Sequence, residues 1–224
     1  YRNKIDVRVV TDGEHTVLDR LEPDYQHTIQ EIPSKPDNGL MLGFEAQRYL
    51  VSQLEQGYDL YGYLEDDLVI QDPQFFQKLS WFQSLMGPED VLLPQRVELP
   101  GGPHWVDRFF IDGPLDAEEL DKLALRRADP LLLKAPGGDV ALETPQNPHA
   151  GCFFLTHAQL QHWVNQPHWM DQDTSFISPL ESAATLGLAK TFRLWKPCFT
   201  HASWFELQHW GTSFHSLIPR PEGD

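Results

Sequence analysis

Three consecutive carboxylates, Glu65-Asp66-Asp67, are the residues of this 224-residue sequence whose type and spacing most directly suggest chemistry. They follow a short apolar segment, residues 60–64, and precede a second apolar run. Carboxylates at the end of a buried strand are costly unless a cation or hydrogen-bond donors compensate them. Mg²⁺ or Mn²⁺ compensates them well, because these ions prefer carboxylate oxygen and keep positions open for phosphate oxygens. The triplet therefore predicts a divalent-cation site, and the alternative is that its acids cap the next turn or face water.

The segments before the triplet are expected to alternate between strands and a helix. The expected strands are residues 5–10, 25–32 and 60–64, and the expected helix is residues 40–56. Gly57 is expected to end this helix, because glycine is common just after the last helical residue. Strand, strand, helix and strand in this order indicate an α/β fold, in which ligands gather at the carboxyl ends of strands.

The rest of the chain is expected to carry shorter elements around a middle that is rich in Pro and Gly, residues 88–146. The expected strands are residues 91–93, 109–111 and 190–195, and the expected helices are residues 116–127 and 156–165. Asp116 is expected to cap the first of these helices. Residues 219–224 are expected to form a frayed tail.

The order of three short motifs resembles the metal-dependent glycosyltransferases of GT-A fold, including the large family-2 group. The motifs are Asp12-Gly13, Asn38-Gly39 and Glu65-Asp66-Asp67. In that family a strand ending in Asp-Gly contacts the nucleotide, an Asn-Gly turn opens a helix, and an Asp-x-Asp-type motif binds metal and sugar diphosphate. The resemblance implies a GT-A-type fold, with a mixed, mostly parallel sheet flanked by helices. It implies donor-binding roles for Asp12, Gly13, Asn38, Gly39 and Asp66.

The resemblance also implies a metal site with ligands from two parts of the chain. Glu65, Asp66 and Asp67 match the acidic motif, and Mn²⁺ or Mg²⁺ is the expected cofactor. Metal-dependent members commonly take one further contact from a C-terminal histidine, which His201 matches by position, with His209 as the competitor. Neutral imidazole is a sound ligand for ions of this class.

Residues 147–156 resemble the small-residue strand that lies beside the donor sugar in this family. Gly151 is the expected donor-binding residue there, because a residue without Cβ lets a ligand approach the backbone closely. A tight turn before a buried strand would explain the same sequence.

Glu181 matches the acidic residue that begins a helix and serves as catalytic base in inverting members of the family. The usual Glu-Asp pair is here reduced to Glu181-Ser182. The alternative is structural, because Ser178-x-x-Glu181 with a proline at the first helical position also predicts a capping box. Asp171 and Asp173 are the substitute candidates for the base.

The resemblance implies a single GT-A-like domain over residues 1–218, with a nucleotide- and metal-binding half at 1–87 and an acceptor-binding half at 88–218. It also implies one further strand–helix unit at the N-terminal side, so either residues 5–10 are that first strand or the unit precedes this sequence. Trp105 is a candidate to stack on a sugar ring. Three residues near the C-terminus are candidates to close over the site, namely Trp204, Trp210 and His215. Core packing is the alternative for each aromatic side chain.

Composition excludes several classes of partner. Acidic residues number 33 against 17 basic ones, so we expect no nucleic-acid partner and repulsion from anionic lipid surfaces. An acidic protein that binds a diphosphate must neutralise it locally, which favours a metal. Four basic residues are candidate helpers: Lys4, Arg8, Lys35 and Lys196.

No apolar run approaches the ~20 residues needed to cross a bilayer, so membrane insertion is not expected. The two cysteines, Cys152 and Cys198, do not make a disulfide framework, and they could pair with each other only if their two strands are neighbours. Free thiols are expected in a reducing compartment, which favours a cytoplasmic location.

These observations predict a metal-dependent glycosyltransferase that moves a sugar from a nucleotide-diphosphate donor to a hydroxyl of a carbohydrate or other acceptor. One alternative is a sugar-phosphate nucleotidyltransferase on a related fold, although its usual Gly-rich, Arg- or Lys-bearing loop is not visible here. The other is a non-catalytic sugar-nucleotide-binding module, and the intact acidic triplet argues against it.

Overall fold

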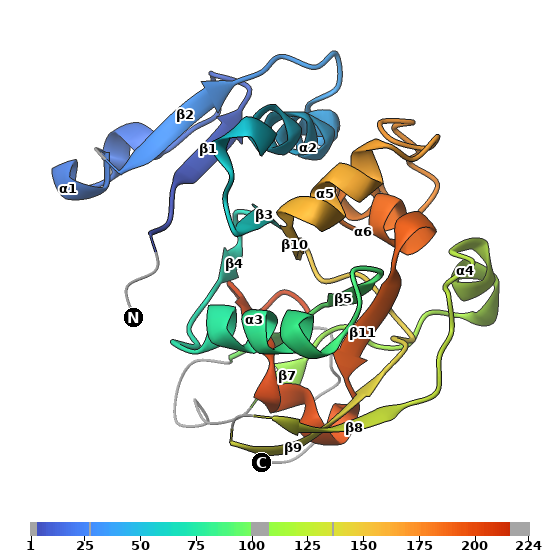
Figure 1. Ribbon diagram of the computed structural model, residues 1–224. Helices are drawn as coiled ribbons and strands as arrows, with labels where there is room; N and C mark the ends of the chain where they lie inside the picture. Colours follow the sequence, from blue (N-terminus) through green and yellow to red (C-terminus); the bar gives the residue numbers. More distant parts are fainter. Residues whose placement is uncertain (1–3, 27, 100–107, 136, 216–224) are drawn as a thin grey trace, which may run out of the picture.

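In the computed structural model of the protein, the described residues are 4–26, 28–99, 108–135 and 137–215. Their strands form four small sheets with helices packed around them (Figure 1), which confirms a mixed α/β fold. Trp105 and the 219–224 tail lie outside the described residues, so the expectations for them stay predictions. No helix in the described ranges is long and apolar enough to cross a membrane.

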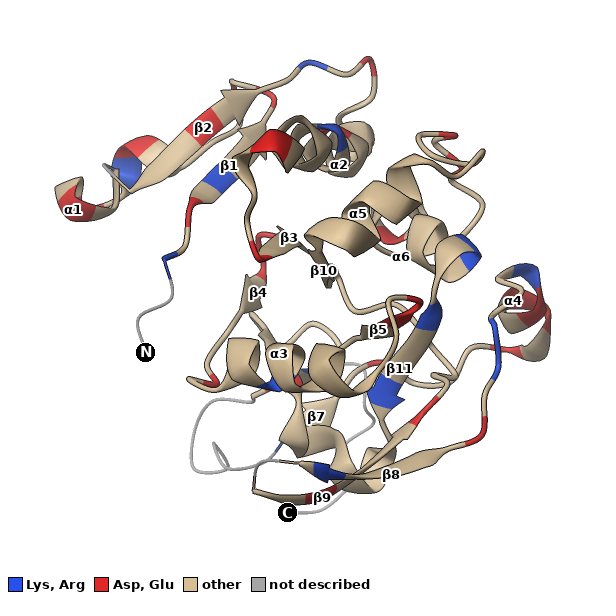
Figure 2. Cartoon of the chain, viewed as in Figure 1, with Lys and Arg blue, Asp and Glu red and all other residues tan. Residues whose placement is uncertain are grey.

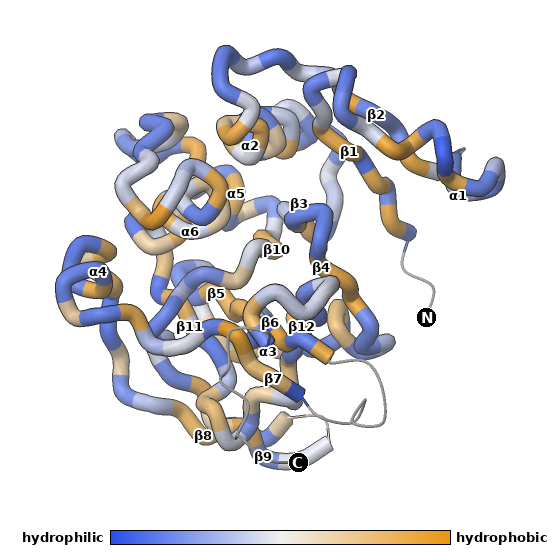
Figure 3. The backbone as a smooth tube through the Cα atoms, turned by 180° about the vertical axis from the view of Figure 1, so that it is seen from behind, coloured by the Kyte–Doolittle hydropathy of each residue, from blue (hydrophilic) through white to orange (hydrophobic). Residues whose placement is uncertain are grey.

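The N-terminal part contains two parallel strands, β1 (Val7–Thr11) and β2 (Ile29–Pro33), with α2 (Leu42–Ser52) packed against β1. The strand β2 begins four residues later than expected, because the preceding residues form a short helix, α1 (Pro23–Gln26). The fixed φ of proline suits the first helical position, which explains this start. Figure 3 shows hydrophobic residues along both strands.

The helical stretch before the acidic triplet covers the residues predicted to be helical, 40–56. Short 3₁₀ turns, Gly39–Met41 and Leu54–Gln56, flank α2. Gly57 has a φ of 66°, which is the left-handed conformation that favours glycine, and it ends this stretch as predicted.

The strand β3 (Leu60–Leu64) has the predicted bounds and pairs antiparallel with β10 (Cys152–Thr156). A capping box between Thr156 and Gln159 then starts α5 (His157–Val164). The acidic triplet lies in the turn between β3 and the short strand β4 (Leu68–Val69), where Figure 2 shows it in red.

Two four-stranded sheets build the rest of the fold. Their strand orders are β5-β11-β9-β8 and β4-β12-β6-β7. The remaining strands are β5 (Asp90–Leu92), β6 (Gln95–Glu98), β7 (Phe109–Phe110), β8 (Leu131–Ala135), β9 (Gly138–Glu143), β11 (Arg193–Pro197) and β12 (Glu206–His209).

The expectation of a mostly parallel sheet is wrong. Of the eight strand pairings in the described residues, three are parallel and five are antiparallel. The physical reason is the short connections of the middle region, because parallel neighbours need a crossover of a dozen or more residues. The hairpin of β8 and β9, which turns between Ala135 and Gly138, is the clearest example.

The helices of the second half differ from expectation in extent. The helix α3 (Phe75–Leu85) was not predicted, and α4 (Ala117–Lys122) is shorter than expected but has Asp116 as its N-cap. The helix α6 (Pro179–Thr191) runs into the segment expected to be a strand at residues 190–195, so β11 begins only at Arg193. Alanine and leucine favour this helical extension.

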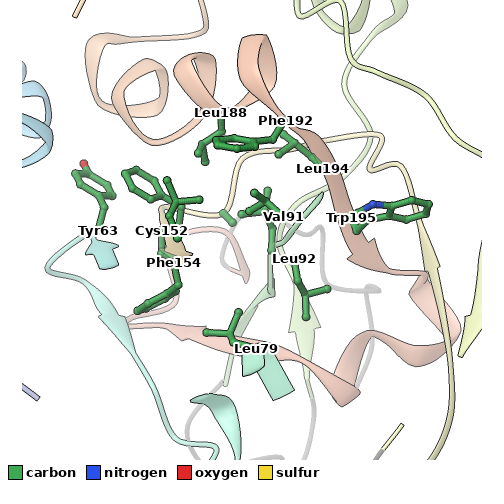
Figure 4. Close-up of a cluster of buried hydrophobic side chains, with 14 of the residues drawn as sticks. Tyr63, Leu79, Val91, Leu92, Cys152, Phe154, Leu188, Phe192, Leu194 and Trp195 are labelled. Atoms are coloured by element: carbon green, nitrogen blue, oxygen red, sulfur yellow. The ribbon is translucent and has the colours of Figure 1, made fainter. Parts of the chain in front are cut away.

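The main hydrophobic core lies between the strands β5, β10 and β11 and the helices α3 and α6 (Figure 4). Leu79, Val91 and Leu188 come from three different elements of this core and are each at most 2% exposed. Both cysteines are free thiols, and Cys152 is fully buried. The core therefore fixes β3 and β10, which carry the candidate site at their ends.

Candidate functional site

The acidic triplet forms the turn that joins β3 to β4. The Leu68 N–H donates to the Glu65 carbonyl at 3.2 Å, which closes the turn. Glu65 is half-buried, whereas Asp66 and Asp67 are exposed, with 48% of the Asp67 side chain accessible. The turn alone therefore resembles a solvated loop. Whether it can bind a metal ion depends on the residues packed against it.

A histidine lies against this turn. His209 ends β12, which pairs antiparallel with β4, and its Nε2 lies 3.1 Å from Asp67 Oδ2. Its Nδ1 lies 3.2 Å from Oε1 of Glu98, a residue of β6 that is completely buried. A buried carboxylate at Nδ1 favours hydrogen on Nδ1. At Nε2, 3.1 Å from Asp67 Oδ2, a proton donated to Asp67 or a cation shared with Asp67 satisfies both groups.

Glu98 also holds the segment that follows β12. Its two carboxylate oxygens accept the backbone N–H groups of Phe214, at 3.0 Å, and of His215, at 2.6 Å. This buried carboxylate therefore has hydrogen-bond partners on both oxygens, which offsets the cost of its burial. The same residue fixes the imidazole of His209 and the chain beyond it.

The donor set of Asp67 and His209 fits a hard divalent ion that also binds substrate. Adjacent ligands of an octahedral ion with bonds of about 2.1 Å lie roughly 3.0 Å apart, close to the separation of these two atoms. Such ions are usually held by one or two protein ligands together with phosphate oxygens and water. Within the described ranges no group of three or more His, Cys, Asp or Glu residues is arranged to hold a metal, so an all-protein cage is not present there.

His201, the histidine favoured by position in the sequence, lies elsewhere. It belongs to the 3₁₀ turn Phe199–Trp204, and its Nδ1 lies 3.3 Å from Cys198 Sγ and 3.2 Å from Thr200 Oγ1. The histidine beside Asp67 is the competitor, His209. Its position depends on the pairing of β12 with β4, which sequence spacing does not reveal.

Gly151 makes room for the side chain of Glu65. Its carbonyl accepts the Glu65 N–H at 2.9 Å, and its φ is 60°. A Cβ at this position would collide with the Glu65 carboxylate and with Leu68. The close approach expected at Gly151 is therefore made by a side chain of the acidic triplet.

The Glu65 carboxyl lies in a strongly perturbed environment. Burial raises its pKa to about 7, and the neighbouring charges of Asp67, Glu181 and Asp66 act in the same direction against an opposing effect of Arg96. Negative charge therefore accumulates around this turn, which is the condition under which a bound cation is favourable.

A buried group of charges lies close to the acidic turn. Arg96 donates from Nη2 to Asp112 Oδ1 at 2.8 Å, and Lys196 donates from Nζ to Asp112 Oδ2 at 3.0 Å. The side chains of Asp112 and Lys196 are 2% and 1% exposed. Lys196 also donates to the His149 carbonyl at 2.6 Å, so it is not available as the expected helper for a diphosphate. Lys35, another candidate helper, pairs with Glu14 on the surface.

Glu181 has a structural contact that competes with the role of base. Ser178 caps α6, with Pro179 at its first position, and the Ser178 hydroxyl donates to the Glu181 carboxylate. The substitute candidates, Asp171 and Asp173, both accept hydrogen bonds from Lys190, at 2.7 and 2.8 Å. Glu181 contributes to the raised pKa of Glu65, so it remains the candidate electrostatically coupled to the acidic turn.

The two N-terminal motifs act as caps of their own turns. Asp12 Oδ1 accepts the N–H groups of Glu14 and His15 at 2.9 and 2.7 Å, and these bonds hold the Asp12 pKa well below its usual range. Asn38 Oδ1 accepts the Leu40 N–H at 3.1 Å, next to Gly39. The turn after Asp12 passes through Gly13, whose φ is 79°.

These donor-binding candidates are not joined to the acidic turn by hydrogen bonds. Across the described ranges, no hydrogen bond or ion pair connects Asp12 or Asn38 with Glu65, Asp66 or Asp67. The donor roles implied for the two turns stay predictions.

His149 predicts a loss of stability in mild acid. Its side chain is almost fully buried, with Nδ1 3.0 Å from Thr185 Oγ1, and burial with the nearby charge of Arg96 lowers its pKa to about 3. An unfolded histidine titrates near about 6.5, so below that pH the unfolded state takes up the proton first and unfolding is favoured. We expect this group to cost about 2 kcal/mol of stability at about pH 5.

Urea denaturation of His149→Gln between pH 7 and 5 would measure this effect. The variant should lose roughly 2 kcal/mol less than wild type over this interval, whereas His162→Gln, at an exposed position of α5, should behave as wild type. Parallel pH profiles for wild type and His149→Gln would contradict the assignment.

No protein-family model, curated protein or solved structure matches this chain. In the candidate site, the contact of Asp67 with a histidine fixed by a buried carboxylate carries the most chemical information.

Proposed function

We propose that this chain is a metal-dependent glycosyltransferase of GT-A-like architecture, which moves a sugar from a nucleotide-diphosphate donor to a hydroxyl of a carbohydrate or other acceptor. The observation that supports it most directly is the row of Glu98, His209 and Asp67. A metal-binding histidine usually donates its second ring N–H to a carboxylate, and this row has that arrangement. The acidic charge around it also requires a cation before a diphosphate binds.

The proposed site draws on both halves of the chain. Asp67 comes from the half assigned to nucleotide and metal, whereas His209 comes from the half assigned to the acceptor. When bound, Mn²⁺ or Mg²⁺ supplies positive charge that stabilises the diphosphate as leaving group. Asp67 and His209 hold it, and Glu98 keeps the His209 ring in the orientation that this requires.

The remaining acids have separate proposed roles. Asp66, exposed beside Asp67, is placed to accept hydrogen bonds from the donor. In an inverting reaction Glu181 takes the proton from the acceptor hydroxyl, which requires the Ser178 hydroxyl to release its carboxylate. In a retaining reaction no such base is needed.

A non-catalytic sugar-nucleotide-binding module is the second candidate. The observation that favours it is the engagement of all three candidate bases, since Glu181 is bonded to Ser178 and both Asp171 and Asp173 to Lys190. Both candidates share the metal-dependent donor site, and they differ only in turnover.

The test is isothermal titration of UDP, GDP and CDP and their sugars, with Mn²⁺ or with EDTA. We expect one nucleotide diphosphate to bind only with Mn²⁺. His209→Ala should weaken this binding by at least about tenfold, because a metal ligand is lost, while His201→Ala should bind as wild type. Binding that is independent of Mn²⁺, or equal losses in the two variants, would contradict the proposal. Hydrolysis of the bound sugar nucleotide would then distinguish the enzyme from the binding module.

A further inference from the structure

One large aromatic side chain is exposed directly beside the proposed metal site. Trp210 follows His209, and 67% of it is accessible to solvent. The backbone N–H of Trp210 donates to the Asp67 carbonyl at 2.7 Å, which extends the β12–β4 ladder by one residue. Because His209 pairs with Leu68, this register places Trp210 directly across from Asp67.

Cross-strand partners of an antiparallel pair lie on the same face, with Cβ atoms roughly 5 Å apart. A ligand bound at Asp67 would therefore lie close to the backbone of Trp210, whose side chain is exposed. Other tryptophans are used for packing, since Trp163 and Trp195 are each 2% exposed. Within the described part of the chain the Trp210 side chain makes no hydrogen bond and no ring contact.

The backbone that carries Trp210 is held on both sides. On one side, the His209 ring is hydrogen-bonded to the Glu98 carboxylate. On the other side, after the next turn, the backbone N–H groups of Phe214 and His215 donate to the same carboxylate. The turn passes through Gly211, whose φ is 111°. An exposed aromatic ring on a fixed backbone is pre-organised for a ligand, because little conformational freedom of the chain remains to be lost on binding.

We propose that Trp210 stacks on the pyranose ring of a sugar held at the metal site, which rests on the proposed function. The flat, apolar indole matches the CH-rich face of a pyranose, and its Nε1–H is available to a sugar hydroxyl. A sugar is favoured over a nucleobase by position. In a sugar nucleotide the sugar is bonded directly to the diphosphate, whereas the base is separated from it by the ribose.

The stacked ring belongs either to the donor or to the acceptor, and the test has an arm for each. Wild type, Trp210→Ala and Trp210→Phe are titrated in Mn²⁺ with UDP, GDP, UDP-glucose, UDP-N-acetylglucosamine and GDP-mannose. The same proteins are titrated with glucose, N-acetylglucosamine and lactose, both alone and with the nucleotide diphosphate that binds. Phe199→Ala is the matched control, because Phe199 is also a largely exposed aromatic residue, at 75%.

We expect Trp210→Ala to weaken binding of one sugar-bearing ligand by roughly tenfold and to leave the nucleotide diphosphate unchanged. A loss confined to sugar nucleotides assigns the donor sugar, and a loss confined to free saccharides assigns the acceptor. Trp210→Phe should recover most of the affinity, since a flat ring remains, and Phe199→Ala should bind as wild type.

The proposal is overturned if Trp210→Ala binds every sugar as wild type does, or if it weakens UDP or GDP as much as the corresponding sugar nucleotide. The proposal is also overturned if wild type binds no free saccharide and binds no sugar nucleotide more tightly than the corresponding nucleotide diphosphate. Failure of the proposed function has a different signature, because then no nucleotide diphosphate binds in Mn²⁺, while the titrations with saccharide alone still report on Trp210.

Discussion

Asp67→Ala is expected to abolish Mn²⁺-dependent binding of the nucleotide diphosphate, with a loss of about a hundredfold or more in affinity. The variant removes the carboxylate that lies 3.1 Å from His209 Nε2, so the proposed ion would lose one of its two proposed protein ligands. Isothermal titration in Mn²⁺ measures the loss. Because about half of the Asp67 side chain is solvent-exposed, the free energy of unfolding should stay within about 0.5 kcal/mol of wild type.

Asp59→Ala is the matched control for Asp67→Ala. Asp59 is an exposed aspartate immediately before β3, at the opposite end of the strand from the acidic turn. The two variants change the net charge equally, so a general effect of charge on an anionic ligand would appear in both. Equal affinity of the two variants, or binding by Asp67→Ala at the wild-type level, would exclude Asp67 as a metal ligand.

The strand that carries the site was predicted to the residue, and the reason is local. A short apolar run, residues 60–64, is bounded by Asp59 and by Glu65-Asp66-Asp67, so its ends are fixed by composition alone. Gly57 and Asp116 were predicted for the same kind of reason, since a left-handed residue and an N-cap depend on neighbours within one turn.

The partners of the site could not be predicted in this way. His209 reaches Asp67 through the pairing of β12 with β4, and Glu98 reaches His209 through the pairing of β12 with β6. These contacts join residues more than one hundred positions apart, so no local pattern specifies them. Position relative to β11 favoured His201 instead. In the structure, half-buried and buried residues alternate along Glu206–His209, and His209 lies on the buried side.

The burial of Lys196 could not be predicted from local sequence either. Lys196 was one of four basic residues expected to help neutralise a diphosphate, yet the fold places it at 1% exposure against Asp112. Burial acts to raise the pKa of Asp112, but Lys196 and Arg96 outweigh this effect and hold it below its usual range. The three side chains therefore form a buried charge network whose net charge is positive, close to the negative turn at Glu65.

Asp112→Ala is expected to destabilise the fold by about 3–5 kcal/mol, the usual cost of removing one partner of a buried ion pair. Both cations would remain, with the Arg96 guanidinium losing bonds of 3.0 and 2.8 Å and Lys196 one of 3.0 Å. Urea denaturation at pH 7 measures the change. Asp139→Ala is the control, because its pair with Lys134 is exposed and should contribute about 1 kcal/mol or less.

The pair Asp112 and Lys196 also allows a direct measurement of their coupling. If most of the loss in Asp112→Ala comes from an uncompensated buried cation, Lys196→Met should be less harmful in the Asp112→Ala background than in wild type. The coupling free energy in this double-mutant cycle is expected to be about 1–3 kcal/mol in favour of the pair. Additive losses, or a loss in Asp112→Ala no larger than that of Asp139→Ala, would show that Asp112 does not balance these charges. The fold would then have to stabilise a buried lysine and arginine by other means, and Glu65 and Asp67 are the other acidic residues whose charges act on Arg96.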